Sequence, residues 1–272
     1  MPIPTALAGT RGEPMVHRVD ERWTMAFAAA LGDVLDAYFD TGRTDGVVAH
    51  PLFAVCPEWP VIVTSRAHSE RLGVTEAELR TSVHASHDVT IHRLVRPGDV
   101  LTTVAETVGV VDITPGALTT TRLETVDADG LPVATTLQDG ISLGVHTVGA
   151  DAPDPSPPPA IEGTDRRGTP LEVSVPVAAG MAHTYTECAR IWNPIHTDRE
   201  VARSAGLPDI ILHGTANLAL GVSAVIAARA DERPELVRRI RCRFAAMVRM
   251  PTTVVVRVWP ANPTGAGRST VP

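Results

Sequence analysis

The hydrophobic pattern of the chain predicts helices at two places. Between residues 23 and 39 the apolar residues recur at helical spacing, with one face formed by Trp23, Phe27, Ala30 and Leu31. A second helix is expected after His213-Gly214, with a packing face formed by Ala216, Leu218, Ala219 and Val222. Strand-like segments follow each helical region. The pattern therefore predicts a fold of the α+β class.

Strands are predicted where Thr and Val dominate, at residues 100–126 and 252–259. The sequence Asp-Ala-Asp-Gly at 127–130 has the composition of a tight turn. It predicts a hairpin that joins residues 117–126 to residues 131–145. This hairpin would be part of an antiparallel sheet in the first half of the chain.

The order of the elements suggests an internal repeat. Three pairs of segments match in the same order along the two halves: 25–40 with 184–198, 45–51 with 208–214, and 91–106 with 244–259. A proline-rich segment separates the halves and cannot continue a helix or a central strand. We therefore expect an N-terminal unit at 1–148, a linker at 149–170 and a C-terminal unit at 171–272.

The second unit is shorter than the first by this comparison. After Thr103 the first half continues through two more strand-like segments, whereas few residues follow the matching Thr253. The second unit is thus predicted to lack its last two strands. Either the sequence is truncated or another element completes the edge of that sheet.

The amino-acid composition argues against several classes of function and of catalytic group. The net charge of −7 argues against non-specific nucleic-acid binding, and no apolar segment approaches the length of a membrane span or a signal peptide. The chain has 24 Lys plus Arg, all of them arginine, which excludes a catalytic lysine. Cys56, Cys188 and Cys242 are too widely spaced for a zinc site, so we expect no metal and a reducing, cytoplasmic location.

Two short segments carry the candidate chemistry. In Asn193-Pro194-Ile195-His196 the proline breaks a helix predicted to end at Ile191-Trp192, so that the imidazole of His196 lies at a turn. In the second segment, His213-Gly214 begins a helix whose free N–H groups would stabilise negative charge. A histidine that moves protons beside such a helix start suits reactions next to a carbonyl group.

Together these segments resemble the MaoC-like dehydratases, the (R)-specific enoyl-thioester hydratases of the hydratase 2 family. The resemblance rests on Tyr185, Asn193-Pro194-Ile195-His196, Asp198, Ala205-Gly206 and Ile211-Leu212-His213-Gly214. It implies a double hotdog, in which two curved antiparallel sheets each wrap a central helix. It also implies His196 as acid/base, Asn193 as the family asparagine, and Gly214 with His213 at the thioester carbonyl, without metal or cofactor.

The chain departs from the family at the acid. The family places an aspartate five residues before the histidine, where this sequence has Ile191. Glu187 would share a helix face with Ile191 one turn away and is the preferred replacement. Asp33 keeps the family's Gly-Asp pair in the first unit, but Tyr38 replaces the histidine there. Asp198 is expected to cap the helix that starts near Arg199.

The leading hypothesis is hydration of a 2-enoyl thioester, or dehydration of a 3-hydroxyacyl thioester, on coenzyme A or acyl carrier protein. One alternative is a repurposed enzyme of the same fold, such as an isomerase or cyclase in specialised metabolism. Another is a non-catalytic subunit that binds acyl thioesters or completes another chain's site. A homodimer or heteromer of hotdog units is expected in either case.

Overall fold

The structure, a computed structural model, describes residues 2–75, 82–161 and 166–260. The first unit contains β1 (Ile3–Pro4), η1 (Thr5–Leu7), β2 (Met15–Arg18), α1 (Glu21–Ala30), α2 (Asp36–Phe39), α3 (Val55–Arg71), β3 (Ser82–Ile91), β4 (Val100–Ile113), β5 (Gly116–Val126), β6 (Pro132–Leu143) and β7 (Thr147–Val148). The second contains β8 (Leu171–Val177), α5 (Met181–Ala189), η2 (Pro194–His196), α6 (Arg199–Ser204), α7 (Gly214–Arg229), η3 (Pro234–Leu236), β9 (Arg239–Arg243) and β10 (Thr252–Val258).

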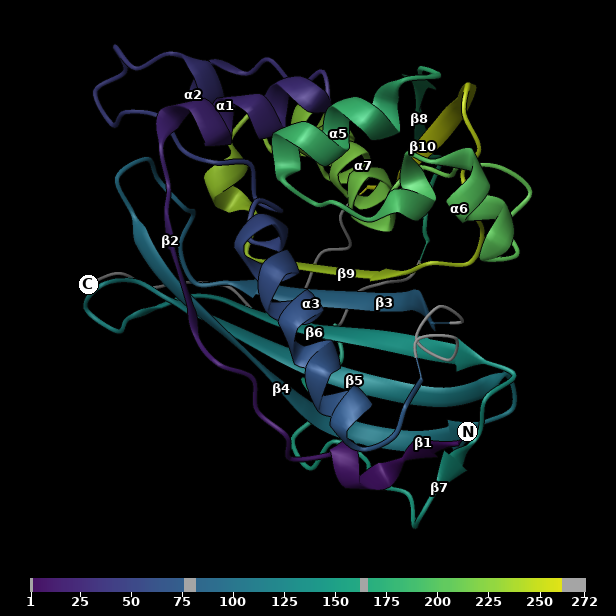
Figure 1. The fold of residues 1–272 in the computed structure, drawn as a ribbon. Helices are drawn as coiled ribbons and strands as arrows, with labels where there is room; N and C mark the ends of the chain where they lie inside the picture. The colour runs from purple at the N-terminus through teal and green to yellow at the C-terminus, as the bar shows by residue number, and fades with distance from the viewer. Residues whose placement is uncertain (1, 76–81, 162–165, 261–272) are drawn as a thin grey trace.

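A six-stranded sheet organises the fold (Figure 1). Its strand order is β2-β4-β5-β6-β3-β9, and all neighbouring strands are antiparallel. The edge strand β9 belongs to the second unit and pairs with β3 of the first, with Cys242 opposite His87. Two smaller sheets have two strands each: β8 pairs with β10, and β1 pairs with β7. The two units therefore share one sheet.

The central helix of the first unit is α3, which lies across the inner face of the sheet (Figure 1). The pattern at 23–39 had predicted a continuous helix, but α1 ends before Gly32, whose φ of +71° is left-handed. No helix was predicted at α3, which contains Pro57 and Pro60. Packing of Val61 against Leu123 helps to hold this helix in place in spite of Pro60.

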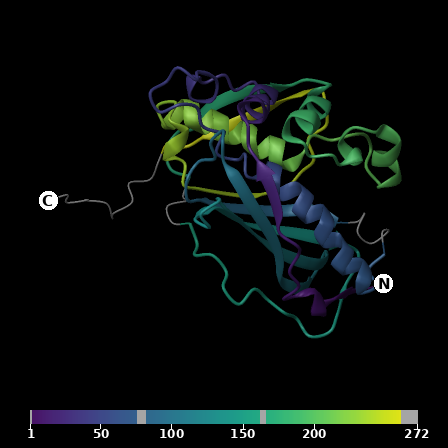
Figure 2. The same cartoon turned by 60° about the vertical axis from the view of Figure 1, so that its left-hand side comes forward.

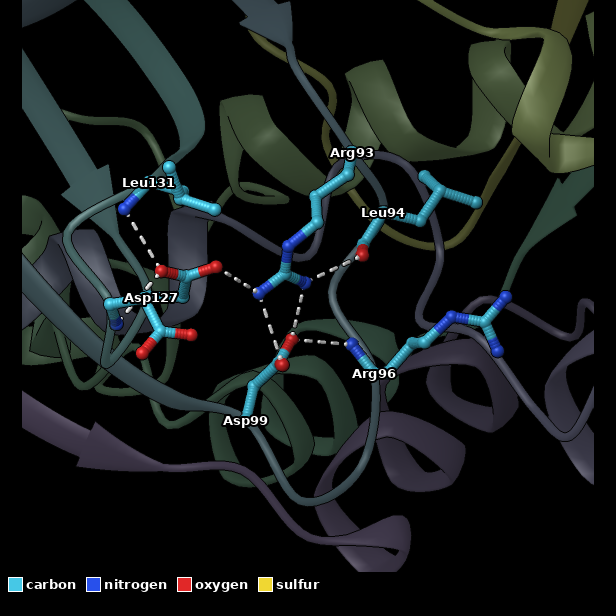
Figure 3. Close-up of polar contacts among 7 residues, drawn as sticks. Arg93, Leu94, Arg96, Asp99, Asp127 and Leu131 are labelled. Atoms are coloured by element: carbon cyan, nitrogen blue, oxygen red, sulfur yellow. Dashed lines mark hydrogen bonds and ion pairs between the residues drawn. The ribbon is translucent and has the colours of Figure 1, made fainter.

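The predicted hairpin is confirmed and is β5–β6. Gly130 has a φ of +77°, and the side chain of Asp127 accepts hydrogen bonds from the backbone of Asp129 and Leu131. Arg93 joins this turn to the turn before β4, since it donates to Asp99 at 2.8 Å and to Asp127 at 3.2 Å (Figure 3). These charge-assisted bonds anchor the end of the sheet.

The internal repeat is visible in three dimensions. Helices α1 and α5 pack against each other, and His50 and His213 each precede the central helix of their unit with side chains 1% and 2% exposed. The apolar face predicted around Trp23 and Phe27 is buried. Within the described residues, the strands of the second unit are β8, β9 and β10. Among these there is no counterpart of β5 or β6 of the first unit.

The segment between the units runs along the outside of the sheet (Figure 2). Ala152 forms an isolated bridge with Val110 of β4, and Asp154 forms an ion pair with Arg122 of β5 at 3.4 Å. The second unit's first strand begins at Leu171. These contacts tie the linker to the first unit's sheet.

Candidate active site

The end of α5 fixes the position of the residue that replaces the family acid. The helix stops at Ala189, and Arg190 takes a left-handed φ of 59°, with its guanidinium 4.1 Å from the centre of the Trp23 ring. The chain then turns inward, so that Ile191 is 4% exposed and belongs to the main hydrophobic core. Its N–H donates to the carbonyl of Thr186 at 3.1 Å.

The following turn is built by local hydrogen bonds. Pro194 occupies the first turn of η2, where its missing N–H costs nothing, and the side chain of Asn193 accepts from the N–H of Ile195 at 3.4 Å. Asp198 caps α6 through bonds from Glu200 and Val201, as predicted. Asn193 therefore shapes the turn that presents His196.

The imidazole of His196 is held in one tautomer. Its Nδ1 lies 2.9 Å from the carbonyl oxygen of Ile211, and because a carbonyl only accepts, Nδ1 must carry the proton. In the neutral ring, Nε2 then has a free lone pair, and none of the hydrogen bonds among the described residues involves it. Burial lowers the pKa of His196 to about 4, opposed in part by this bond. His196 is thus neutral, with an unprotonated Nε2.

His213 lies directly against His196. The two rings are stacked, with centroids 3.8 Å apart and planes inclined by 30°. Thr186 places its hydroxyl 3.1 Å from Nε2 of His213, and the Tyr185 ring, whose hydroxyl donates to Thr215, packs 5.0 Å from the His213 ring. Burial, followed by the neighbouring His196, lowers the pKa of His213 to about 2. His213 is therefore a neutral supporting group.

Gly214 is the first residue of α7, as the sequence predicts. The N–H groups of the first helical turn have no partner inside the helix and carry the positive end of its dipole. A Cβ at this position would lie 3.3 Å from Cε1 of Phe244, so the ring of Phe244 covers the glycine closely. The helix start and the histidine pair together form a site that can accept a proton and stabilise negative charge.

The two candidate acids are not joined to this site. Glu187 is exposed, and its expected alignment with Ile191 is wrong because α5 ends at Ala189. Asp33 lies in the first unit, where its Oδ2 and the hydroxyl of Tyr38 are both buried and unbonded among the described residues. Burial and the nearby Asp33 raise the pKa of Tyr38. Their catalytic roles stay predictions, which substitution can test.

Sequence reasoning missed Thr186 and Phe244. Thr186 precedes Glu187 and is 4% exposed, and helical periodicity places it on the buried face beside Tyr185. Phe244 had no comparable signal, because it reaches Gly214 only through the pairing of β9 with β3.

An open groove of about 590 Å³ adjoins the segment that leads into the helix start. It is lined by Pro208, Asp209, Met247, Val248, Arg249, Met250, Pro251, Thr252 and Val254. The N–H of Leu212 donates to Val248, and Ile211 bridges Arg249, so one wall of the groove supports the residue that orients His196. Neither His196 nor His213 lines the groove.

Metal ligands and membrane spans were considered for the residues that the structure describes. There, no group of three or more His, Cys, Asp or Glu side chains is placed to hold a metal ion. No helix in that part is both long and apolar enough to cross a membrane.

Comparison with known families assigns both units. Residues 164–271 match the MaoC like domain, and residues 6–136 match the FAS1-like dehydratase domain region. The chain carries a MaoC-like dehydratase domain. Its motif, from Tyr185 to Gly214, lies within the matched region.

Curated relatives of this MaoC-like protein include hydratases. It is 26% identical over 184 residues to the enoyl-CoA hydratase ChsH3 of Mycobacterium tuberculosis, an alignment covering 68% of this chain and 63% of that protein. It is 23% identical to the peroxisomal multifunctional enzyme type 2 of Drosophila melanogaster, over 87% of this chain and 40% of that enzyme. The chain thus spans less than two thirds of the length of either relative.

Solved structures confirm the expected fold. A MaoC-like dehydratase from Phytophthora capsici superposes with a TM-score of 0.77 at 20% identity, covering 93% of this chain and 87% of that one. A Mycobacterium tuberculosis protein described as a double hotdog gives a TM-score of 0.60 at 16% identity, covering 91% and 82%. The MaoC-like protein is a double hotdog, with an antiparallel sheet and central helices.

Proposed function

We propose that the protein hydrates a 2-enoyl thioester, or dehydrates the corresponding 3-hydroxyacyl thioester, with His196 as the group that moves the proton. The observation that carries this proposal is the hydrogen bond from Nδ1 of His196 to the carbonyl of Ile211. It leaves Nε2 free to act as a base beside the start of α7. The name of one relative, the enoyl-CoA hydratase ChsH3 of Mycobacterium tuberculosis, supports the same reaction class.

The reaction follows from this geometry. Nε2 of His196 removes a proton from water while the water oxygen bonds to Cβ of the substrate. The negative charge that develops on the thioester oxygen is stabilised by N–H groups at Gly214. The imidazolium then returns its proton to Cα, which completes the addition of water. Dehydration follows the same steps in reverse.

A single histidine must therefore serve both as base and as acid, because Ile191 has no proton to exchange. Its stacking on neutral His213 keeps a second positive charge away from the imidazolium. The buried Ile191 also favours the second candidate function, a repurposed enzyme or a partner subunit that binds thioesters without hydrating them. Such a protein would keep the carbonyl-binding helix start and lack water addition.

Coenzyme A or acyl carrier protein is proposed as the thioester carrier, and the name of the relative ChsH3 supports coenzyme A. The homodimer or heteromer of hotdog units and the cytoplasmic location remain predictions. So do the boundaries between the two units and the linker.

A thioester hydration assay tests the function. Loss of enoyl absorbance is followed on short, medium and branched 2-enoyl-CoA substrates, with wild type beside His196→Ala. His92→Ala is the matched control, because His92 is exposed and its ring lies on the surface beside the Thr135 hydroxyl. Turnover that is lost in His196→Ala and kept in His92→Ala supports hydration through His196. Absence of turnover in the folded wild type, with thioester binding retained, would favour the second candidate.

A further inference from the structure

The inner face of the shared sheet contains buried histidines that the proposed reaction does not use. His87 of β3 is 1% exposed, and neither of its ring nitrogens has a hydrogen-bond partner among the described residues. Nε2 of the neighbouring His84 is also buried and unbonded there, with ring centroids 5.5 Å apart. A desolvated imidazole without a partner is unfavourable, so such groups call for a ligand or an ordered water.

The sheet register shows that these side chains face the core. Alternation along β3 places His87 on the same face as Val89 and Ile91, which belong to the main hydrophobic core. Cys242 of β9 and Gln138 of β6 lie directly opposite His87. The row through His87 is therefore polar, and in the next row Val89 lies between Ile240 and Thr136.

This polar row is connected to the site at α7. The His84 ring packs 4.6 Å from the Phe244 ring, and Phe244 in turn covers Gly214. Asn217 lies one turn along α7 from Gly214, on the same helix face, and its Oδ1 is another buried oxygen without a partner in the described structure. Phe244 therefore lies between Gly214 and His84.

We propose that His84, His87 and Asn217 form a polar subsite that binds an oxygen atom carried by the acyl chain beyond the reacting carbons. The subsite rests on the proposed thioester function and specifies its substrate class. A neutral imidazole with both nitrogens free offers one donor and one acceptor on opposite sides of the ring, and a hydroxyl group can accept from the donor or donate to the acceptor. The preferred substrates are then hydroxylated or oxygenated acyl thioesters, and plain alkyl chains leave the histidines unpaired.

Binding of saturated thioesters tests this inference, because a saturated chain cannot be hydrated. Octanoyl-CoA is compared by calorimetry with octanoyl-CoA hydroxylated at carbon 5 or at carbon 7. We expect at least one hydroxylated chain to bind about tenfold more tightly, because a chain without a hydroxyl group leaves the buried polar groups of the subsite unpaired. His87→Leu and the half-buried His84→Leu should each reduce the preference to about twofold or less, and exposed His146→Leu should keep it.

Equal binding of all three chains to wild type would overturn the subsite, as would a preference that survives the double substitution of His84 and His87. If His87→Leu does not fold, His84→Leu alone decides between these outcomes. Turnover of enoyl thioesters without any preference would reject the subsite and leave the proposed function intact. A preference without turnover would reject hydration only. Failure of the folded protein to bind any of the thioesters would overturn both.

Discussion

His196 and His213 stack with their ring centroids 3.8 Å apart, and Nδ1 of His196 donates a hydrogen bond to the backbone carbonyl of Ile211. The two rings differ in what they can do. His196 is half-buried with a free Nε2, whereas His213 is 2% exposed and bonded to Thr186. His196 can therefore exchange protons with a substrate, and the ring of His213 packs against it. Substitutions can test these two roles and the replacement of the family acid by Ile191.

Restoring the family acid should increase hydration. In Ile191→Asp a carboxyl group is placed five residues before His196, where it can share proton transfer, and we expect kcat to rise about tenfold or more. Because Ile191 lies in the core, the free energy of unfolding should fall by about 2–4 kcal/mol. Ile191→Asn is the matched control for shape and polarity without an acid. Equal rates in the two variants would show that the carboxyl group has no role.

The exposed Glu187 should be dispensable. No hydrogen bond or ion pair among the described residues joins it to His196, and we expect Glu187→Gln to change kcat by about twofold or less. Asp33→Asn examines the other candidate acid in the same assay. A loss of about a hundredfold or more in either variant would identify that residue as the missing acid.

Acid should unfold the protein through its buried histidines. Burial lowers the pKa of His50 from its ordinary 6.5 to about 3, so between these values the unfolded chain binds more protons than the folded one. Stability is therefore complete above pH 6.5 and falls as the pH decreases through this window, by about 1.4 kcal/mol per pH unit for each such histidine.

Urea unfolding between pH 4.5 and 7.5 measures this slope. His50→Gln removes one titrating ring from contact with Leu52 and Ser223, and the slope should decrease by about 1.4 kcal/mol per pH unit. A slope that is the same in wild type and His50→Gln would contradict the assignment to His50.

Two glycines of α7 offer a paired test of the helix start. A Cβ at Gly214 would press on Phe244, so Gly214→Ala should shift that ring and reduce kcat about tenfold or more. Gly221 has open space where its Cβ would be, and Gly221→Ala should stabilise the protein by about 0.5–1 kcal/mol with unchanged kcat. Thermal unfolding and the hydration assay separate the two effects. Full activity in Gly214→Ala would argue against a carbonyl at this position.

The sequence by itself determined the parts of the site that are built by neighbouring residues. The turn at Asn193 and Pro194, the cap at Asp198 and the helix start at Gly214 depend on hydrogen bonds that span a few residues. The β5–β6 hairpin is specified in the same way by the turn at Asp127 and Gly130. Local geometry of this kind is encoded in residue type and order.

The tertiary structure decided what depends on residues far apart in the chain. The tautomer of His196 is set by Ile211, Phe244 reaches Gly214 because β9 joins the first unit's sheet, and α3 forms in spite of Pro60. Glu187 does not align with Ile191 because α5 ends at Ala189, which the apolar pattern through Ile191 and Trp192 did not predict. Each outcome depends on the local conformational preference of the residues and on their burial against side chains far away in the sequence. The second contribution exists only in the folded protein.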